Sequence, residues 1–176
     1  MQRIMMGVVG ILLTASQAIT LSQAGQPPKV ATDITAAEVQ SVLAAPTGGG
    51  DRQMKVVDMG KYNVSVGVLH RGKTTPGAPV GGINHERITE VYYVISGSGT
   101  LVTGGTVENV RPSPPEGEIV KVAVGPSNNA TFKEPAQSRK VGPGDIVIIP
   151  PGVYHGFSEV PDHVLPAGYV HPLLKK

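Results

Sequence analysis

Residues 142 to 159 read Gly142-Pro-Gly-Asp-Ile-Val-Ile-Ile-Pro-Pro-Gly-Val-Tyr-His-Gly-Phe-Ser-Glu159. The β-branched run Ile146 to Ile149 follows a Gly-Pro-Gly-Asp turn and predicts a strand. Pro150-Pro151-Gly152 ends that strand, because proline cannot donate to a sheet ladder and glycine accepts backbone angles that other residues resist. A second strand at 153–158 carries His155. The pattern therefore places an imidazole just beyond a tight turn, where it can bind a metal or transfer a proton.

A second informative stretch lies upstream and reads His85-Glu-Arg-Ile-Thr-Glu90-Val-Tyr-Tyr-Val-Ile-Ser-Gly97-Ser-Gly99. Together the two stretches resemble the cupin superfamily. The first cupin motif is Gly, five residues, His-x-His, three or four residues, Glu, six residues and Gly. His85, Glu90 and Gly97 fit its second half, whereas the first histidine of the motif falls on Ile83.

The second cupin motif is Gly, five residues, Pro-x-Gly, two residues, His, three residues and Asn. Gly144, Pro150, Gly152 and His155 fit it at every spacing. The asparagine position is occupied by Glu159. The resemblance covers roughly residues 55 to 172 and implies a double-stranded β-helix.

Short segments separated by glycine and proline also favour an all-β sandwich or barrel. We predict an all-β fold, a cupin or jelly-roll barrel with a short N-terminal helix. The expected strands lie at 55–59, 62–71, 87–96, 99–103, 119–124, 138–141, 146–149, 153–158 and 163–170. Trp is absent and Phe occurs twice, so valine and isoleucine must fill the core.

The N-terminal helix is predicted from the capping box Thr35-Ala-Ala-Glu38, and it ends before Pro46. We expect it to pack against the outside of the barrel or against a partner subunit. Residues 104–118 form a longer segment, which we read as a loop that either covers the barrel as a lid or is decoration.

Residues 1–24 are typical of a secretory signal, with Arg3 before an apolar run and small residues at Ala18 and Ala24 that suit cleavage. An uncleaved anchor is the alternative. The expected organisation is a signal peptide at 1–24, a lead with a short helix at 25–52 and a barrel at 53–176. We expect a periplasmic or secreted protein without stable membrane insertion after cleavage.

Charge and cysteine content narrow the function classes. Without residues 1–24 the chain has 14 basic and 13 acidic residues, because only Arg3 is lost from the 15 basic residues. This balance argues against nucleic acid as a partner. The chain has no cysteine, so an exported protein of this sequence depends on its core rather than on disulfides.

The candidate metal ligands are His85, Glu90 and His155. Two histidines and one carboxylate are a set associated with Fe(II), although Mn, Ni, Cu or Zn can also use it. We therefore expect one divalent transition metal, with Fe(II) favoured. His70 or His171 is a candidate for a fourth ligand, and a degenerate barrel without metal is the alternative.

Strand alternation places Tyr92 on the face of Glu90, and Glu159 on the face of His155. Tyr92 and Glu159 are the candidate catalytic residues, as proton donor or acid/base. Arg71 can bind a substrate carboxylate, or it can be a solvated surface residue.

The sequence therefore predicts a small exported metal-dependent enzyme acting on a small organic substrate inside the barrel. Dioxygenase, isomerase and lyase chemistry stay open, because a fold does not fix a reaction. The alternatives are a non-catalytic barrel that binds a small ligand and a structural barrel whose role is dimerisation. The family resemblance implies a homodimer.

Overall fold

The computed structural model describes residues 27–44 and 50–171, with side chains described up to residue 164. Its helical elements are the α-helix α1 (Ala36–Ala44) and a π-helical turn η1 (Val120–Val124). The strands are β1 (Gly50–Asp58), β2 (Asn63–Gly72), β3 (Gly81–His85), β4 (Thr89–Gly97), β5 (Gly99–Thr103), β6 (Thr106–Pro112), β7 (Ser127–Glu134), β8 (Gln137–Val141), β9 (Ile146–Ile149), β10 (His155–Glu159) and β11 (His163–His171). Neither described helix has the length and apolarity of a membrane span.

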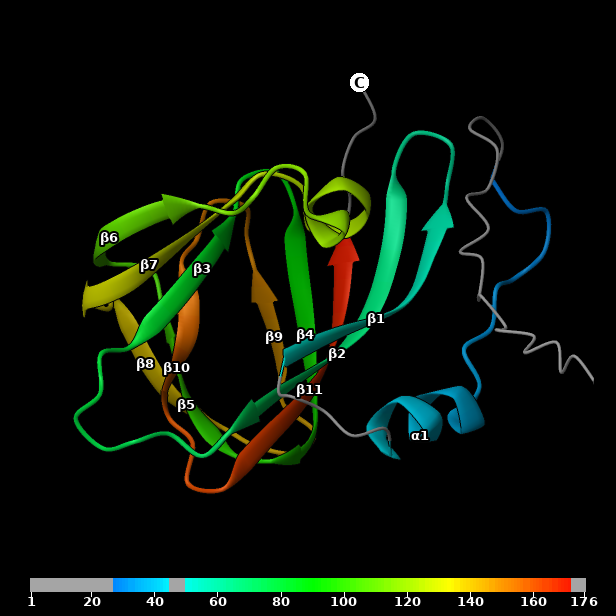
Figure 1. Ribbon diagram of the computed structural model, residues 1–176. Helices are drawn as coiled ribbons and strands as arrows, with labels where there is room; N and C mark the ends of the chain where they lie inside the picture. The colour runs from blue at the N-terminus through cyan, green and yellow to red at the C-terminus, as the bar shows by residue number, and fades with distance from the viewer. Residues whose placement is uncertain (1–26, 45–49, 172–176) are drawn as a thin grey trace, which may run out of the picture.

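The strands form two antiparallel sheets that face each other (Figure 1). One has the order β1-β2-β11-β4-β9, and the other has the order β6-β7-β3-β10-β5-β8. From β2 to β5, and again from β8 to β11, each successive strand lies in the opposite sheet. This alternate winding is the double-stranded β-helix that the sequence predicts.

The core lies between the two sheets. Strands β4 and β9 contribute Tyr92, Val94, Val147 and Ile149, and Leu101 on β5 packs against them from the other sheet. The buried apolar residues are mainly valine, isoleucine and leucine, as the composition requires. Small β-branched side chains fit the closely spaced facing strands of such a barrel.

The hairpin of β6 and β7 extends the second sheet beyond β3 (Figure 1). The prediction of a loop at 104–118 was therefore wrong for 106–112, which form β6. The prediction of a strand at 119–124 was also wrong, since Val120–Val124 form η1. A short apolar run does not distinguish a strand from a helical turn. Strand β7 was not predicted, because its sequence, Ser-Asn-Asn-Ala-Thr-Phe-Lys-Glu, is mostly polar and shows no clear alternation of apolar and polar residues.

Helix α1 lies outside the barrel beside β1, as predicted (Figure 1). Its capping box forms, because the backbone N of Thr35 donates to Glu38 Oε2 at 2.6 Å and the backbone N of Glu38 donates to Thr35 Oγ1 at 3.2 Å. Arg52 Nη1 on β1 donates to the carbonyl of Val42 at 3.0 Å. The predicted signal peptide at 1–24 lies outside the described residues.

Candidate metal centre

Three predicted ligands meet between the two sheets. His85 is the last residue of β3 and His155 is the first residue of β10, so both lie in the second sheet, while Glu90 comes from β4 of the first. All three are buried, with 7%, 4% and 6% of the residue surface exposed, respectively. One ligand atom from each lies within 4.8 Å of those from the other two. Strand alternation brings Glu90 inward, together with Tyr92 and Val94, as predicted.

Glu90 Oε2 is the meeting point of the cluster. It lies 2.8 Å from His155 Nε2 and 3.5 Å from His85 Nε2. The two imidazole rings are tilted against each other, with centroids 5.6 Å apart. Although His155 Nε2 approaches Glu90 closely, it is buried and has no aligned hydrogen-bond partner among the described residues. This ring nitrogen is thus held at a site that offers it a negative charge and no well-formed hydrogen bond.

The proton on each ring can be assigned from its other nitrogen. His155 Nδ1 lies 3.1 Å from the carbonyl of Val153, which can only accept, so Nδ1 carries a hydrogen. His85 Nδ1 lies 2.6 Å from Ser127 Oγ. Ser127 Oγ donates its own hydrogen to the carbonyl of Gly125 at 2.8 Å, so it accepts from His85 Nδ1.

In the neutral form of both rings, Nε2 therefore presents a lone pair toward the carboxylate of Glu90. Three buried acceptor atoms then face one another, which is unfavourable unless a cation or added protons lie between them. Two imidazole nitrogens and one carboxylate oxygen are ligands for divalent transition metals. The donor set fits such an ion, which would be held by His85, Glu90 and His155.

The predicted turn of the second motif is hydrogen-bonded to the strand that carries His85. Gly152 occupies the third position of a turn closed by the Val153 amide and the Pro150 carbonyl, with φ of +79°. Its backbone N donates to the carbonyl of His85 at 2.7 Å. Asn84 Nδ2 donates to the carbonyl of Gly152 at 3.2 Å. The turn that precedes His155 is thereby fastened to the strand that carries His85.

The charges around Glu90 set its protonation. Burial alone would raise the pKa of Glu90, but His155 and His85 lower it to about 2 by hydrogen bonds and charge when their Nε2 atoms carry protons. Tyr92 Oη donates toward Glu90 Oε2 at 3.5 Å. Burial first, and then the charge of Glu90, raises the pKa of Tyr92 well above its ordinary value. Tyr92 is thus a neutral proton donor beside an ionised carboxylate at neutral pH.

A cavity of about 260 Å³ opens from the cluster. Arg71 on β2 lines it and forms an ion pair with Asp51 on β1. Burial opposes the charge of Arg71, but the hydrogen bond and charge of Asp51 raise its pKa, so the guanidinium stays charged. Ile119 and Ser113 also line the cavity, together with parts of η1. Part of the segment read as a possible lid therefore forms a wall of this cavity.

Other predicted site residues lie elsewhere. Glu159 is exposed and accepts from Thr100 Oγ1 at 3.4 Å, because a register shift between Phe157 and Glu159 interrupts the alternation that placed it beside His155. His70 is not part of the cluster, and its ring stacks with His163 at 6.4 Å between centroids.

Ile83 pairs with His155 across β3 and β10 and lines the cavity. It offers no ligand atom at the position of the missing histidine. His171 pairs through its backbone with Thr89, and its side chain lies outside the described residues. Ser127 was not predicted as a site residue, because it contacts His85 across 42 residues and no sequence motif includes it.

No protein-family model matches the sequence, and no curated protein matches it. Similar solved structures include a protein with a double-stranded β-helix domain from Klebsiella pneumoniae, at 18% identity, TM-score 0.46 and coverage of 83% of this chain and 100% of that chain. KdgF from a Halomonas species has 17% identity, a TM-score of 0.39 and coverage of 70% and 80%. Hydroquinone 1,2-dioxygenase in complex with Cd²⁺ and 4-hydroxybenzonitrile has 11% identity, a TM-score of 0.44 and coverage of 92% of each chain.

The fold assignment comes from this chain itself. Its strands wind alternately between two sheets, and the turn at Gly152 and the residues His85, Glu90 and His155 occupy the positions that the two motifs predict. The chain is a double-stranded β-helix whose two motifs resemble those of the cupin superfamily.

Proposed function

We propose that the protein is a small metal-dependent enzyme that acts on a small organic molecule inside the barrel. One observation carries this proposal. The hydrogen bonds of Val153 and Ser127 leave His155 Nε2 and His85 Nε2 directed at Glu90, in a buried site that suits a divalent cation. The adjoining cavity of about 260 Å³ gives a small substrate room beside that site.

Fe(II) is the favoured ion, because two histidines and one carboxylate on one side of an ion leave other coordination positions open. Mn, Ni, Cu and Zn are the alternatives. When bound, the ion would polarise a substrate oxygen or activate water or an oxygen species. Dioxygenase, isomerase and lyase reactions all remain candidates.

The residues around the ligands would hold and orient the substrate. Tyr92 keeps its proton at neutral pH and can donate a hydrogen bond to a substrate oxygen in the cavity. Val68, Leu69 and Ile83 form part of the apolar lining of the cavity. Arg71, paired with Asp51, supplies a fixed positive charge at the same cavity.

Elemental analysis of the purified protein tests the metal centre. We expect close to one equivalent of a transition metal in the wild type, and much less in His85→Ala and His155→Ala. His163→Ala is a matched control, since His163 is partly exposed and lies outside the cluster. Failure to retain any metal after reconstitution with Fe(II), Mn, Ni, Cu and Zn would overturn the proposal.

The second candidate function is a non-catalytic barrel that binds a small ligand in the same cavity. Turnover of candidate substrates separates the two functions. If the protein is an enzyme, the wild type should turn a substrate over, and His155→Ala should lose this turnover while circular dichroism shows that its fold is retained. If the protein only binds a ligand, the metal-loaded wild type should bind small molecules but turn none of them over.

We also propose that the protein is exported to the periplasm or secreted, because Arg3 and the apolar run after it are typical of a signal. Mass spectrometry of the native protein should give a mature chain that begins at Gly25, or at Ile19 if cleavage follows Ala18.

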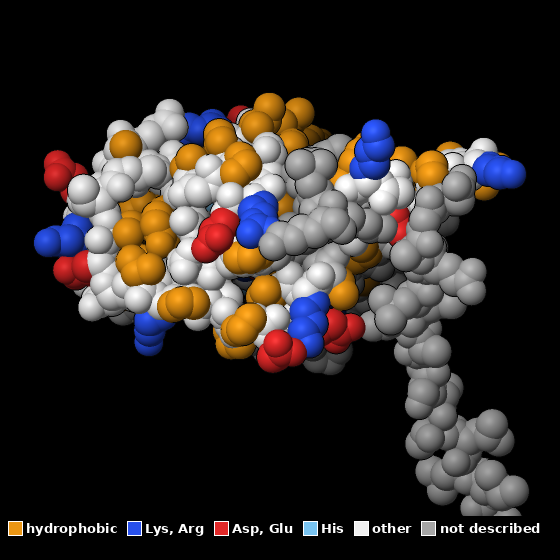
Figure 2. All heavy atoms as spheres, turned by 90° about the horizontal axis from the view of Figure 1, so that it is seen from above, with side chains coloured by type: hydrophobic (Ala, Val, Ile, Leu, Met, Phe, Trp, Pro, Cys, Tyr) orange, Lys and Arg blue, Asp and Glu red, His pale blue; other side chains and the backbone are white. Residues whose placement is uncertain are grey.

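On the face in Figure 2, acidic and basic side chains are interspersed rather than gathered by sign.

A homodimer remains a further proposal. Strand β9 is at the edge of its sheet, and it exposes 63% of Ile146 and 68% of Ile148. Exposed isoleucines side by side on an edge strand favour contact with a second copy. Sedimentation should therefore show a dimer for the wild type and a shift toward monomer for Ile148→Lys.

A further inference from the structure

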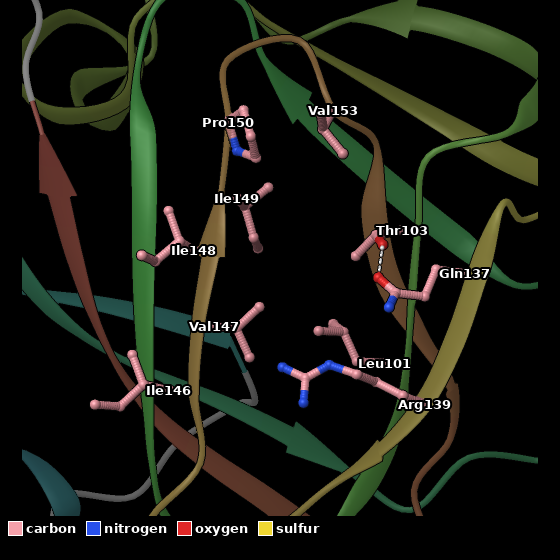
Figure 3. A pocket seen from close by; sticks show the side chains of 10 residues that line it. All are labelled: Leu101, Thr103, Gln137, Arg139, Ile146, Val147, Ile148, Ile149, Pro150 and Val153. Atoms are coloured by element: carbon pink, nitrogen blue, oxygen red, sulfur yellow. Dashed lines mark hydrogen bonds between the residues drawn. The ribbon is translucent and has the colours of Figure 1, made fainter.

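A second hollow lies on the other side of the barrel, and we call it the seam slot. It lies between β8 and β9, each of which is at the edge of its sheet. Its volume is about 500 Å³. It is lined by Leu101, Thr103, Gln137, Arg139, Ile146, Val147, Ile148, Ile149, Pro150 and Val153 (Figure 3). Among the described residues, none of these lines the metal cavity.

The inner wall of the seam slot is apolar. Leu101, Val147 and Ile149 belong to the buried core, and Val153 packs against that core. Figure 3 shows these side chains pointing into the space between the two strands. Such a wall favours the hydrocarbon part of a ligand over water.

Arg139 supplies a positive charge inside this apolar frame. It pairs with Leu101 across β8 and β5, so the two side chains share the inward face of the sheet. Its guanidinium extends across the slot toward β9 (Figure 3). Within the part of the chain that the structure describes, it forms no hydrogen bond and no ion pair.

Gln137 adds a neutral donor on the same side. Thr103 Oγ1 donates to Gln137 Oε1 at 3.4 Å, which leaves the Nε2 group of Gln137 available. Gln137 and Arg139 are two residues apart on β8, so both face the slot. A guanidinium and an amide on one edge, with an apolar wall behind them, suit a carboxylate attached to a hydrocarbon body.

We propose that the seam slot binds a small organic carboxylate, with Arg139 as the charge partner of the carboxylate and Gln137 as a second donor. The aryl or alkyl part of the ligand lies against Leu101, Val147 and Ile149. This site is separate from the metal cavity and does not depend on a bound metal.

Benzoate is a suitable probe, with benzamide as its neutral counterpart, and binding can be followed by the backbone amide NMR signals. We expect saturable shifts at 137–139, 146–149 and 152–153 on adding benzoate, since Pro150 and Pro151 have no backbone N–H. Benzamide should bind at least about tenfold more weakly, because hydrogen bonds to charged groups are the stronger class. The same shifts should persist in His155→Ala, so that failure of the metal centre leaves this result unchanged.

Arg139→Gln should weaken benzoate binding by about tenfold or more, and Arg139→Lys by less. Lys140→Gln is the matched control, since it removes the same charge from the next residue, which is exposed and faces outward. Its affinity should stay within about twofold of the wild type. Thermal unfolding of each variant checks that the fold is retained.

Three results would overturn the proposal. The first is that benzoate shifts only residues of the metal cavity, such as His85 and Ser127. The second is equal weakening by Arg139→Gln and Lys140→Gln, which indicates a general charge effect. The third is that Arg139→Gln leaves benzoate affinity unchanged and self-associates more than the wild type, as expected of a charge that only protects an edge strand.

Discussion

At the residue scale, the centre depends on which nitrogen of His85 carries its proton. Ser127 determines this, because it gives its own hydrogen to the Gly125 carbonyl and accepts from His85 Nδ1. The Nε2 lone pair of His85 is then free to face Glu90. Hydrogen-bonding partners of this kind orient metal-binding histidines.

Ser127→Ala should therefore weaken Zn²⁺ binding by about 10- to 100-fold, the range found when such partners are removed. Without Ser127, neutral His85 can move its proton to Nε2 and donate it to Glu90. The ¹⁵N NMR signals of the His85 ring report that tautomer directly in the metal-free protein. Ser65→Ala is the matched control, because Ser65 is a buried serine that lines the same cavity, and its hydroxyl has no hydrogen-bond partner in the described part of the chain. An unchanged tautomer in Ser127→Ala would contradict this role.

Glu90 should also make the stability of the metal-free protein depend on pH. Its folded-state pKa of about 2 is below its ordinary value of 4.5. The ionised carboxylate therefore favours the folded state above pH 4.5, and this contribution is lost as the pH falls toward 2. From pH 5 to pH 2, the free energy of unfolding should fall by about 3 kcal/mol more in the wild type than in Glu90→Gln. Urea unfolding at several pH values measures this difference. The same pH dependence of the free energy of unfolding in the wild type and in Glu90→Gln would show that the histidines do not hold Glu90 ionised.

At the element scale, the turn after β9 joins the two motifs. The type of turn was predictable, because Pro-Pro-Gly favours a turn with glycine at its third position. Its partner was not predictable, since the hydrogen bond from Gly152 to the His85 carbonyl connects segments that are distant in sequence. The same limit explains why β3 and β7 were missed, because their strand character comes from pairing with each other and not from apolar alternation.

Gly152→Ala should lower the free energy of unfolding by about 1–2 kcal/mol, the cost of a left-handed backbone for a residue with a Cβ. The added methyl group meets no atom of residues 27–44 or 50–171 within 4 Å, so the loss of stability comes from the φ of +79° and not from a clash. Gly142→Ala is the control, because Gly142 lies nearby with free space for a methyl group and without a positive φ. Urea unfolding of the two variants should separate them by at least about 1 kcal/mol. Equal stability would mean that the turn relaxes at little cost.

Helix α1 shows the opposite case, in which local sequence was sufficient. The capping box involves residues three apart, so its hydrogen bonds form wherever the rest of the chain lies. The positions of His85, Glu90 and His155 were likewise predictable, because each lies inside a compact motif. How the ring protons are placed was not, because that depends on Ser127 and Val153 in the folded chain.

At the scale of the whole molecule, the three candidate metal ligands come from both sheets. Glu90 comes from β4 in one sheet, whereas His85 and His155 come from β3 and β10 in the other. Unfolding separates the sheets and takes the three ligands apart. A bound ion therefore stabilises the folded barrel as a whole, because it binds the folded state and not the unfolded chain.

Adding Zn²⁺ at about 100 times its dissociation constant should raise the free energy of unfolding by about 2.7 kcal/mol. The gain should be seen in urea unfolding of the metal-free wild type with and without Zn²⁺, and it should disappear on adding a chelator. His155→Ala should lose most of the gain, while His163→Ala should keep it, since His163 lies outside the cluster. An equal gain in both variants would place the ion elsewhere on the protein. A gain that is larger in the wild type and His163→Ala than in His155→Ala would instead show that the ion is bound by His155 and the other two ligands between the sheets.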